Sequence, residues 1–361
     1  MAEEKNFVLT FLKMSESFYS VFIGILKWRG QTYPISSILL QILGAIGILY
    51  FIVNDYKIIF QNDILNIILK TLLRFNVFLL VLWTYFGGLY QHSRTASIVD
   101  DLWKITRRFE QLGIRLPCLQ LIFYQIAEFF LIAINIYFVT KVNLLKSHDP
   151  LWWLDWICAV WMRTSLIICF TSFTKYVHLI LLQFREVNAI CRRLENPAYS
   201  VSQQILVILN IREQHMAISN ATRKILNFYQ HYLFLYSTWS VLGIVYYVSV
   251  INMYLETQND EFYIVWYSAS TILMIIGLIL FMINMCTVAA TEGNYTRNMI
   301  YDMTSDKHNL GLRVEVYSFF EYLERQKIEF RLYGTIGLNN SSLLYAYVAA
   351  ISYWRIMTKL N

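Results

Sequence analysis

The sequence predicts an all-α membrane protein with seven transmembrane helices and helical extensions on the cytoplasmic side. Three observations support this fold class. Of the 361 residues, 57% are hydrophobic and only 15% are charged, whereas soluble domains average about 45–50% apolar and about 25% charged residues. The apolar residues form continuous runs rather than the alternating pattern of barrel strands. Lys and Arg residues are concentrated in every second connecting segment.

Seven apolar stretches approach the roughly 20 residues that one helical bilayer crossing needs. Only four prolines and no Gly/Ser-rich linker occur in the chain, so we expect these stretches to form one domain over residues 1–361. The predicted spans are residues 35–53, 75–91, 121–140, 152–173, 232–252, 262–286 and 334–354.

The distribution of basic residues predicts the orientation. The N-terminal segment and the segments between spans two and three, four and five, and six and seven hold 22 of the 30 Lys and Arg residues. Because basic residues are retained in the cytoplasm, we expect a cytoplasmic N-terminus and an extracellular C-terminus. Residues 97–112 have apolar side chains at spacings of three and four, and residues 179–194 and 312–330 behave similarly. These segments are the expected cytoplasmic helices.

Three charged residues lie within the predicted spans, which are Glu128 in the third, Arg163 in the fourth, and Asp155 at the edge of the fourth. A charge at the middle of a membrane helix costs about 2.5–3.5 kcal/mol on insertion scales, so it is normally paired or faces water. The first interpretation is a buried ion pair between Glu128 and Arg163 on neighbouring helices. The alternative is that Arg163 belongs to a solvated ligand cavity.

Aromatic residues gather toward the expected outer ends of several spans. Such rings often form a belt at the membrane surface, where amphipathic side chains anchor a helix. The deeper ones can instead form the wall of an aromatic pocket for a small molecule. The candidate pocket residues are Trp156, Tyr246, Tyr247, Trp266 and Tyr267.

The motifs of several function classes are missing. The sequence has no phosphate-binding loop, no dinucleotide fingerprint, no nucleophile elbow and no pair of histidines at metal-ligand spacing. We therefore expect no catalytic residues, no metal site and no cofactor, and we do not expect an enzyme. The net charge of +6 follows from the orientation charges and does not indicate a nucleic-acid partner.

The seventh predicted span is unusually polar. It contains Asn339, Asn340, Ser341 and Ser342, followed by small residues that allow close contact between helices. Such a helix is poorly suited to lipid on all sides. We expect it to lie centrally, against other helices or beside a water-filled path.

A spaced motif occupies the C-terminal region. Phe330 is followed by Gly334 four residues later and by the pair Leu338 and Asn339, while Tyr347 lies nearer the end. From residue 315 onward the chain resembles insect gustatory receptors, which belong to the seven-helix gustatory/odorant receptor superfamily. The terminal motif of that family differs here at four positions, which are Ala346, Ser352, Tyr353 and Trp354.

The resemblance implies a ligand-gated, non-selective cation channel in the plasma membrane of sensory neurons. It implies a small-molecule tastant, with a bitter compound favoured over a sugar, and assembly as a homotetramer or as a heterotetramer with other gustatory receptor subunits. The expected further partners are the lipid bilayer and permeant cations. In the family the last helix lines the pore, so the pore and its gate are assigned to Tyr347, Ala350, Tyr353 and Trp354.

Three other functions are compatible with a multi-span receptor. A G-protein-coupled chemoreceptor would need the reverse orientation, and receptors of that class usually have prolines inside their spans, whereas all four prolines here lie outside them. A secondary transporter would favour duplicated halves, and the sequence has no internal repeat. A non-conducting partner subunit of a heteromeric receptor stays open as an alternative.

Overall fold

The structure is a computed structural model of the whole chain. It describes residues 98, 100–111, 113–114, 119–144, 152–194, 200–256, 262–304 and 310–339, together with residues 27–28, 31–32, 71–73, 75–76, 79, 341, 348, 352 and 355.

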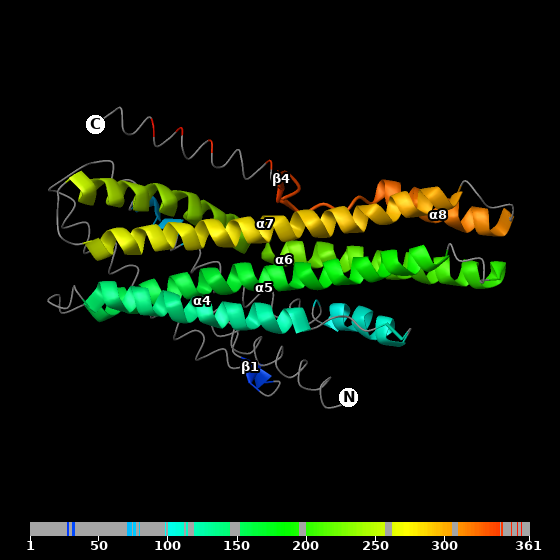
Figure 1. Cartoon of the computed structure of the whole chain (residues 1–361), viewed down its shortest axis with the longest axis horizontal. Coiled ribbons are helices and arrows are strands. Elements are labelled where there is room, and N and C mark those ends of the chain that lie inside the picture. Colours follow the sequence, from blue (N-terminus) through cyan, green and yellow to red (C-terminus); the bar gives the residue numbers. More distant parts are fainter. Residues whose placement is uncertain are drawn as a thin grey trace.

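Long helices dominate the part of the chain that the structure describes. Helices α4 to α7 pack along the long axis of the molecule, and the shorter α8 lies at one end (Figure 1). Two small antiparallel ribbons pair β1 with β2 and β3 with β4. The bounds are β1 Lys27–Trp28, β2 Gln31–Thr32, α4 Leu119–Leu144, α5 Trp152–Leu194, α6 Val201–Glu256, α7 Phe262–Thr304, α8 Leu310–Arg325, β3 Arg331–Leu332 and β4 Ile336–Gly337.

Four of these helices, α4 to α7, are long and apolar enough to cross a membrane. They contain the predicted spans three to six, whose helical structure is confirmed. The first predicted span and most of the second lie outside the described residues. Among these four helices, α5 is the most deeply buried. In its most apolar stretch 89% of the residues are buried, against 28% in that of α4 and 28% in that of α6.

Three helices are much longer than a bilayer is thick. Helix α6 has 56 residues and is therefore about 84 Å long, whereas the hydrocarbon layer is about 30 Å thick. Beside the extended ends of α6 and α7, α8 buries one stripe of side chains at spacings of three and four. The described members of the stripe predicted in residues 97–112 are helical and buried as well. The α8 stripe consists of Leu312, Val316, Phe319 and Leu323, and the earlier one includes Ile98, Leu102, Ile105 and Phe109.

Two predicted helix boundaries at the C-terminal side are wrong. The helix expected over residues 312–330 ends at Arg325, and the seventh span does not begin at Gly334. Tyr333 and Gly334 have φ values of 52° and 71°, which a right-handed helix does not allow. They form the turn between β3 and β4, and the backbone N–H of Leu338 donates to the carbonyl of Phe330 at 2.7 Å.

This hairpin is attached to α6 and α7. The amide of Asn294 on α7 donates to the carbonyl of Ile328 at 2.9 Å and accepts from its N–H at 3.0 Å. The hydroxyl of Tyr333 is hydrogen-bonded to Nδ1 of His231 on α6, and its ring packs edge-on against Phe234. The buried side chains of Phe330 and Leu338 complete the attachment.

Gly293 on α7 is closely packed against Phe184 of α5 and against Ile328. A Cβ atom at this position would lie 2.9 Å from Cδ1 of Ile328 and 3.0 Å from Cε2 of Phe184, whereas a Cβ at Gly277 on the same helix meets nothing within 4 Å. We expect Gly293→Val to destabilise the protein by about 1–3 kcal/mol through overpacking. The measurement is the apparent melting temperature of the detergent-purified chain.

Gly277→Val is the matched control, because both substitutions put the same side chain on α7. It should leave the melting temperature nearly unchanged. A similar decrease for both variants would contradict the close packing at Gly293.

Candidate functional site

Helix α5 has a buried cation, Arg163, whose side chain contacts α6 and α7. The side chain of Arg163 is only 3% exposed. Its Nη1 donates to the hydroxyl of Thr271 on α7 at 3.0 Å, and its Nη2 donates to the hydroxyl of Tyr247 on α6 at 2.6 Å. Thr271 donates its own hydroxyl proton to the carbonyl of Tyr267, so its oxygen is oriented to accept from Arg163. The acceptors of these two hydrogen bonds are side-chain hydroxyl groups.

Aromatic rings surround this guanidinium. Its central carbon lies 4.3 Å from the ring centre of Tyr267 and 5.6 Å from that of Tyr247, and both distances are within cation–π range. The ring of Tyr246 packs edge-on against Tyr247 with centres 5.4 Å apart. Tyr267 and Thr271 are one helical turn apart and therefore share the face of α7 toward α5. We call Arg163, Tyr247, Tyr267 and Thr271 the Arg163 cluster.

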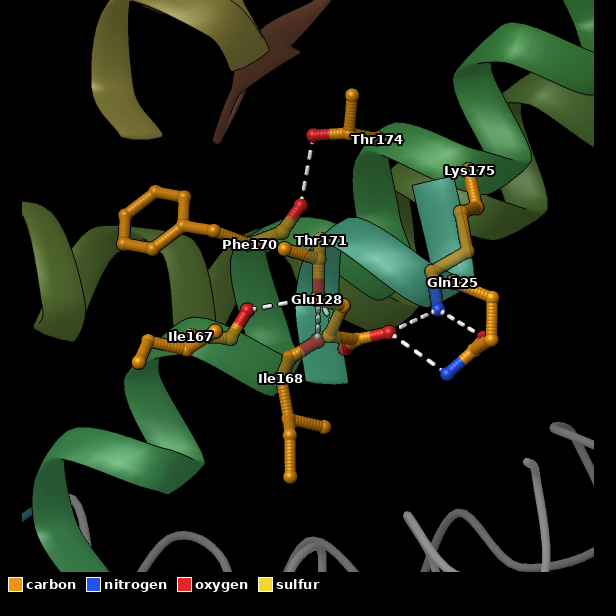
Figure 2. A network of polar contacts seen from close by, with 8 residues as sticks. All are labelled: Gln125, Glu128, Ile167, Ile168, Phe170, Thr171, Thr174 and Lys175. Carbon is orange, nitrogen blue, oxygen red and sulfur yellow. Dashed lines mark hydrogen bonds and ion pairs between the residues drawn. The ribbon is translucent and has the colours of Figure 1, made fainter. Parts of the chain in front are cut away.

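A second buried polar group joins α4 to α5. Figure 2 shows the carboxylate of Glu128 between Thr171 and Lys175. The ammonium of Lys175 donates to Glu128 and, at 2.7 Å, to Oε1 of Gln125, whose Nε2 donates to Glu128 at 3.0 Å. Glu128 is fully buried and Lys175 is 8% exposed. We call Gln125, Glu128, Thr171 and Lys175 the Glu128 network.

Within the described residues, no group of three His, Cys, Asp or Glu side chains is arranged to hold a metal ion. The three described cysteines, Cys169, Cys191 and Cys286, are buried and not in disulfides.

A family model described as 7tm Chemosensory receptor matches residues 18–357. The chain belongs to this family. The family is one of receptors rather than of enzymes, and its members span membranes. The resemblance seen in the C-terminal motif is thus confirmed at the level of the chemosensory receptor superfamily.

Solved structures share the fold of this receptor. The olfactory receptor OR5 of the insect Machilis hrabei has a TM-score of 0.70 and 11% sequence identity, with 98% of each chain covered. The same protein in complex with eugenol has a TM-score of 0.74 and 13% identity, with 98% of this chain and 100% of that chain covered. A search of curated protein sequences finds no match.

The predicted ion pair between Glu128 and Arg163 is wrong. Helices α4 and α5 are antiparallel, and Glu128 lies opposite Thr171 and Lys175. Arg163 is eight residues before Thr171, which is about 12 Å along the helix. The two charges therefore lie at different depths, and Arg163 turns instead to Tyr247 and Thr271.

The five candidate pocket residues are not equivalent in the receptor. Tyr246, Tyr247 and Tyr267 lie together beside Arg163. Trp156 is partly buried, and its Nε1 donates to the hydroxyl of Thr140 on α4 at 2.8 Å. Trp266 is 60% exposed. Consecutive residues of a helix point about 100° apart, so Trp266 turns away from the face on which Tyr267 contacts Arg163. Trp266 therefore belongs to the outer surface of the bundle, and we leave it out of the proposed site.

The four residues assigned to the pore and gate, Tyr347, Ala350, Tyr353 and Trp354, lie outside the described residues.

Sequence reasoning missed Lys175, which follows the predicted end of the fourth span by two residues. A usable signal was present. Gln125 and Glu128 are three residues apart on one helix, and Thr171 and Lys175 are four apart on the next. Such spacings put each pair on one face, so polar stripes of complementary charge on two apolar helices indicate a buried contact.

Removal of one partner from the Glu128 network should destabilise the receptor strongly. Lys175→Met leaves a buried carboxylate without its cation, and we expect a loss of about 3–5 kcal/mol. The double variant Glu128→Gln/Lys175→Met should recover most of this loss, because neither charge is then buried alone. The measurement is again the apparent melting temperature in detergent.

The exposed ion pair between Lys224 and Asp101 supplies the control. Exposed pairs contribute about 0–1 kcal/mol, so Lys224→Met should have a small effect. If the double variant is no more stable than Lys175→Met, the two charges do not act as a pair.

Proposed function

We propose that the receptor is a gustatory receptor subunit that forms a ligand-gated, non-selective cation channel. Its ligand is a small-molecule tastant, bitter rather than sugar. The channel is a homotetramer, or a heterotetramer with other gustatory receptor subunits, in the plasma membrane of sensory neurons. Membership of the chemosensory receptor family and the gustatory-type motif around Phe330 and Leu338 support this proposal.

The observation that carries the ligand-binding part is the Arg163 cluster. It joins three helices through polar groups and rings at the end of the bundle opposite α8. Arg163 is 11 residues from the start of α5, or roughly 16 Å along the helix. With the cytoplasmic N-terminus that the basic residues predict, this end of the bundle is the outer one. A tastant could then reach this site from outside the cell.

Opening then follows from differential binding. A tastant shifts the channel toward the open state only to the extent that it binds that state more tightly. The Arg163 cluster suits this role because it contacts α5, α6 and α7 at once, so a change in their relative positions alters the site. Eugenol, the small molecule in the OR5 complex, supports a small organic ligand.

Expression in cells that lack sensory proteins, alone and with other gustatory receptor subunits, tests the proposal. Whole-cell recordings with a panel of bitter compounds, sugars and small organic acids should show an evoked cation current. The current should persist when a GDP analogue in the pipette blocks G-protein signalling. Loss of the response under blockade would favour a G-protein-coupled receptor instead.

The proposed gate gives a sharper prediction. Four Trp354 side chains around one axis would close a pore by excluding water, as hydrophobic constrictions do. Trp354→Ala should therefore raise the resting cation current several-fold in cells that receive no ligand. Staining of intact cells for an epitope tag after Asn361 measures surface expression and also tests the extracellular C-terminus. An unchanged resting current at equal surface expression would contradict the gate assignment.

A further inference from the structure

The two buried cations of α5, Lys175 and Arg163, differ in whether a negative charge lies beside them. Lys175 has the carboxylate of Glu128 as its partner. Arg163, 3% exposed, has no carboxylate within ion-pair distance among the described residues, and its hydrogen bonds go to Tyr247 and Thr271. A buried charge is normally paired with an opposite charge. Within the described part of the chain, Arg163 therefore lacks the group that a membrane-buried cation most favours.

The guanidinium has capacity for such a group. It has five N–H donors in a planar fork, and the bonds to Thr271 and Tyr247 use two of them. The rings of Tyr267 and Tyr247 hold its orientation. A planar donor set fixed in this way matches the two oxygens of a carboxylate, which guanidinium groups bind with two parallel hydrogen bonds.

Neighbouring helix faces carry donors that are buried and unused. Asn135 on α4 is 4% exposed, and its Nδ2 has no hydrogen-bond partner among the described residues. It lies two turns after Glu128 on the same face of α4. The α4–α5 pairs of Glu128 with Thr171 and of Thr140 with Trp156 put Asn135 at the level of Arg163.

Helix α7 contributes a similar group. Ser268 is 1% exposed, and its hydroxyl is unpartnered within the described part of the chain. It precedes Thr271 by three residues and thus lies on the face of α7 that contacts Arg163. Buried donors without partners are rare in folded proteins and call for an explanation. One acceptor-rich group bound at Arg163 explains both Asn135 and Ser268.

We propose that the receptor binds small organic acids, whose carboxylate is held by Arg163 with donors from Asn135 and Ser268. The organic body lies against the rings of Tyr246, Tyr247 and Tyr267. This inference rests on the proposed ligand-gated function, because it names the chemical class of the ligand at the same site.

Binding is tested on the detergent-purified, full-length receptor without any recording of current. The probes are benzoate and phenylacetate at pH 7, each compared with its primary amide, which has the same shape but no charge. A ligand that binds only the folded protein raises its melting temperature, and the rise grows with the logarithm of the ligand concentration once this concentration exceeds the Kd. Charge-assisted hydrogen bonds are roughly twice as strong as neutral ones. We therefore expect the acids to act at about tenfold lower concentrations than the amides, a difference of about 1.4 kcal/mol in binding free energy.

Three variants assign the effect to Arg163. Arg163→Gln should abolish the difference between acid and amide, and Arg163→Lys should weaken the binding of acids but keep their advantage. Arg212→Gln is the matched control, because Arg212 is partly exposed near α8 and is paired with Glu315. It should keep the full preference for acids even if its basal melting temperature falls.

Every outcome of these measurements either supports or overturns the carboxylate site. Equal stabilisation by acids and amides, or an unchanged preference in Arg163→Gln, overturns the proposal, and so does the absence of binding by either acid. If Arg163→Gln does not fold, the affinity of Arg163→Lys for acids decides instead, because acids that bind this variant as tightly as the unaltered receptor overturn the proposal. An acid preference that depends on Arg163, in a protein that passes no current, would support the carboxylate site and contradict the channel function.

Discussion

Hydrocarbon provides no partner for a charge, and this constraint organises the described bundle around α5. The helix carries two buried cations, and each must be compensated by a neighbouring helix. Lys175 is bound to Glu128 and thereby fixes α4. Arg163 is bound to Tyr247 and Thr271 and thereby fixes α6 and α7. The most buried helix is thus also the one whose polar contacts reach all its neighbours.

Polar contacts also define how far the helices are shifted along one another. Apolar burial is non-directional and tolerates sliding, whereas a hydrogen bond joins two particular residues. Arg163 with Thr271 and Asn188 with Thr296 are both pairs of residues 108 positions apart. Helices α5 and α7 therefore run parallel and in step from the Arg163 cluster to the extended region. There, His215 on α6 reaches the carbonyl of Gly293.

Local patterns predicted the parts of the fold that depend on a single helix. Continuous apolar runs identified the four described membrane helices, and the spacing of Ile98, Leu102 and Phe109 identified a buried stripe. The pairing of charges depends instead on the offset between two helices, which no single run contains. The candidates Glu128 and Arg163 were correctly seen as buried. The polar stripe that holds Lys175 gave a signal for the partner of Glu128, but the partners of Arg163 depend on an offset that the sequence does not contain.

The arrangement of neighbouring helices also explains why only some of the predicted pocket residues lie together. Composition marked a cluster of rings near Tyr246 and Tyr267, but it did not show that Trp266 points the other way, because that depends on which face of α7 meets α5. The hairpin was missed for a different reason. A Gly before an apolar stretch fits a helix start as well as a turn, and only the left-handed backbone of Tyr333 and Gly334 distinguishes them.

The attachment of that hairpin joins it to two helices at once. Asn294 on α7 holds both the N–H and the carbonyl of Ile328, and Tyr333 is bonded to His231 on α6. Because these three hydrogen bonds have fixed partners, a shift of the hairpin relative to α6 or α7 would break at least one of them. The hairpin therefore follows any displacement of this pair of helices and acts as a rigid bracket between them.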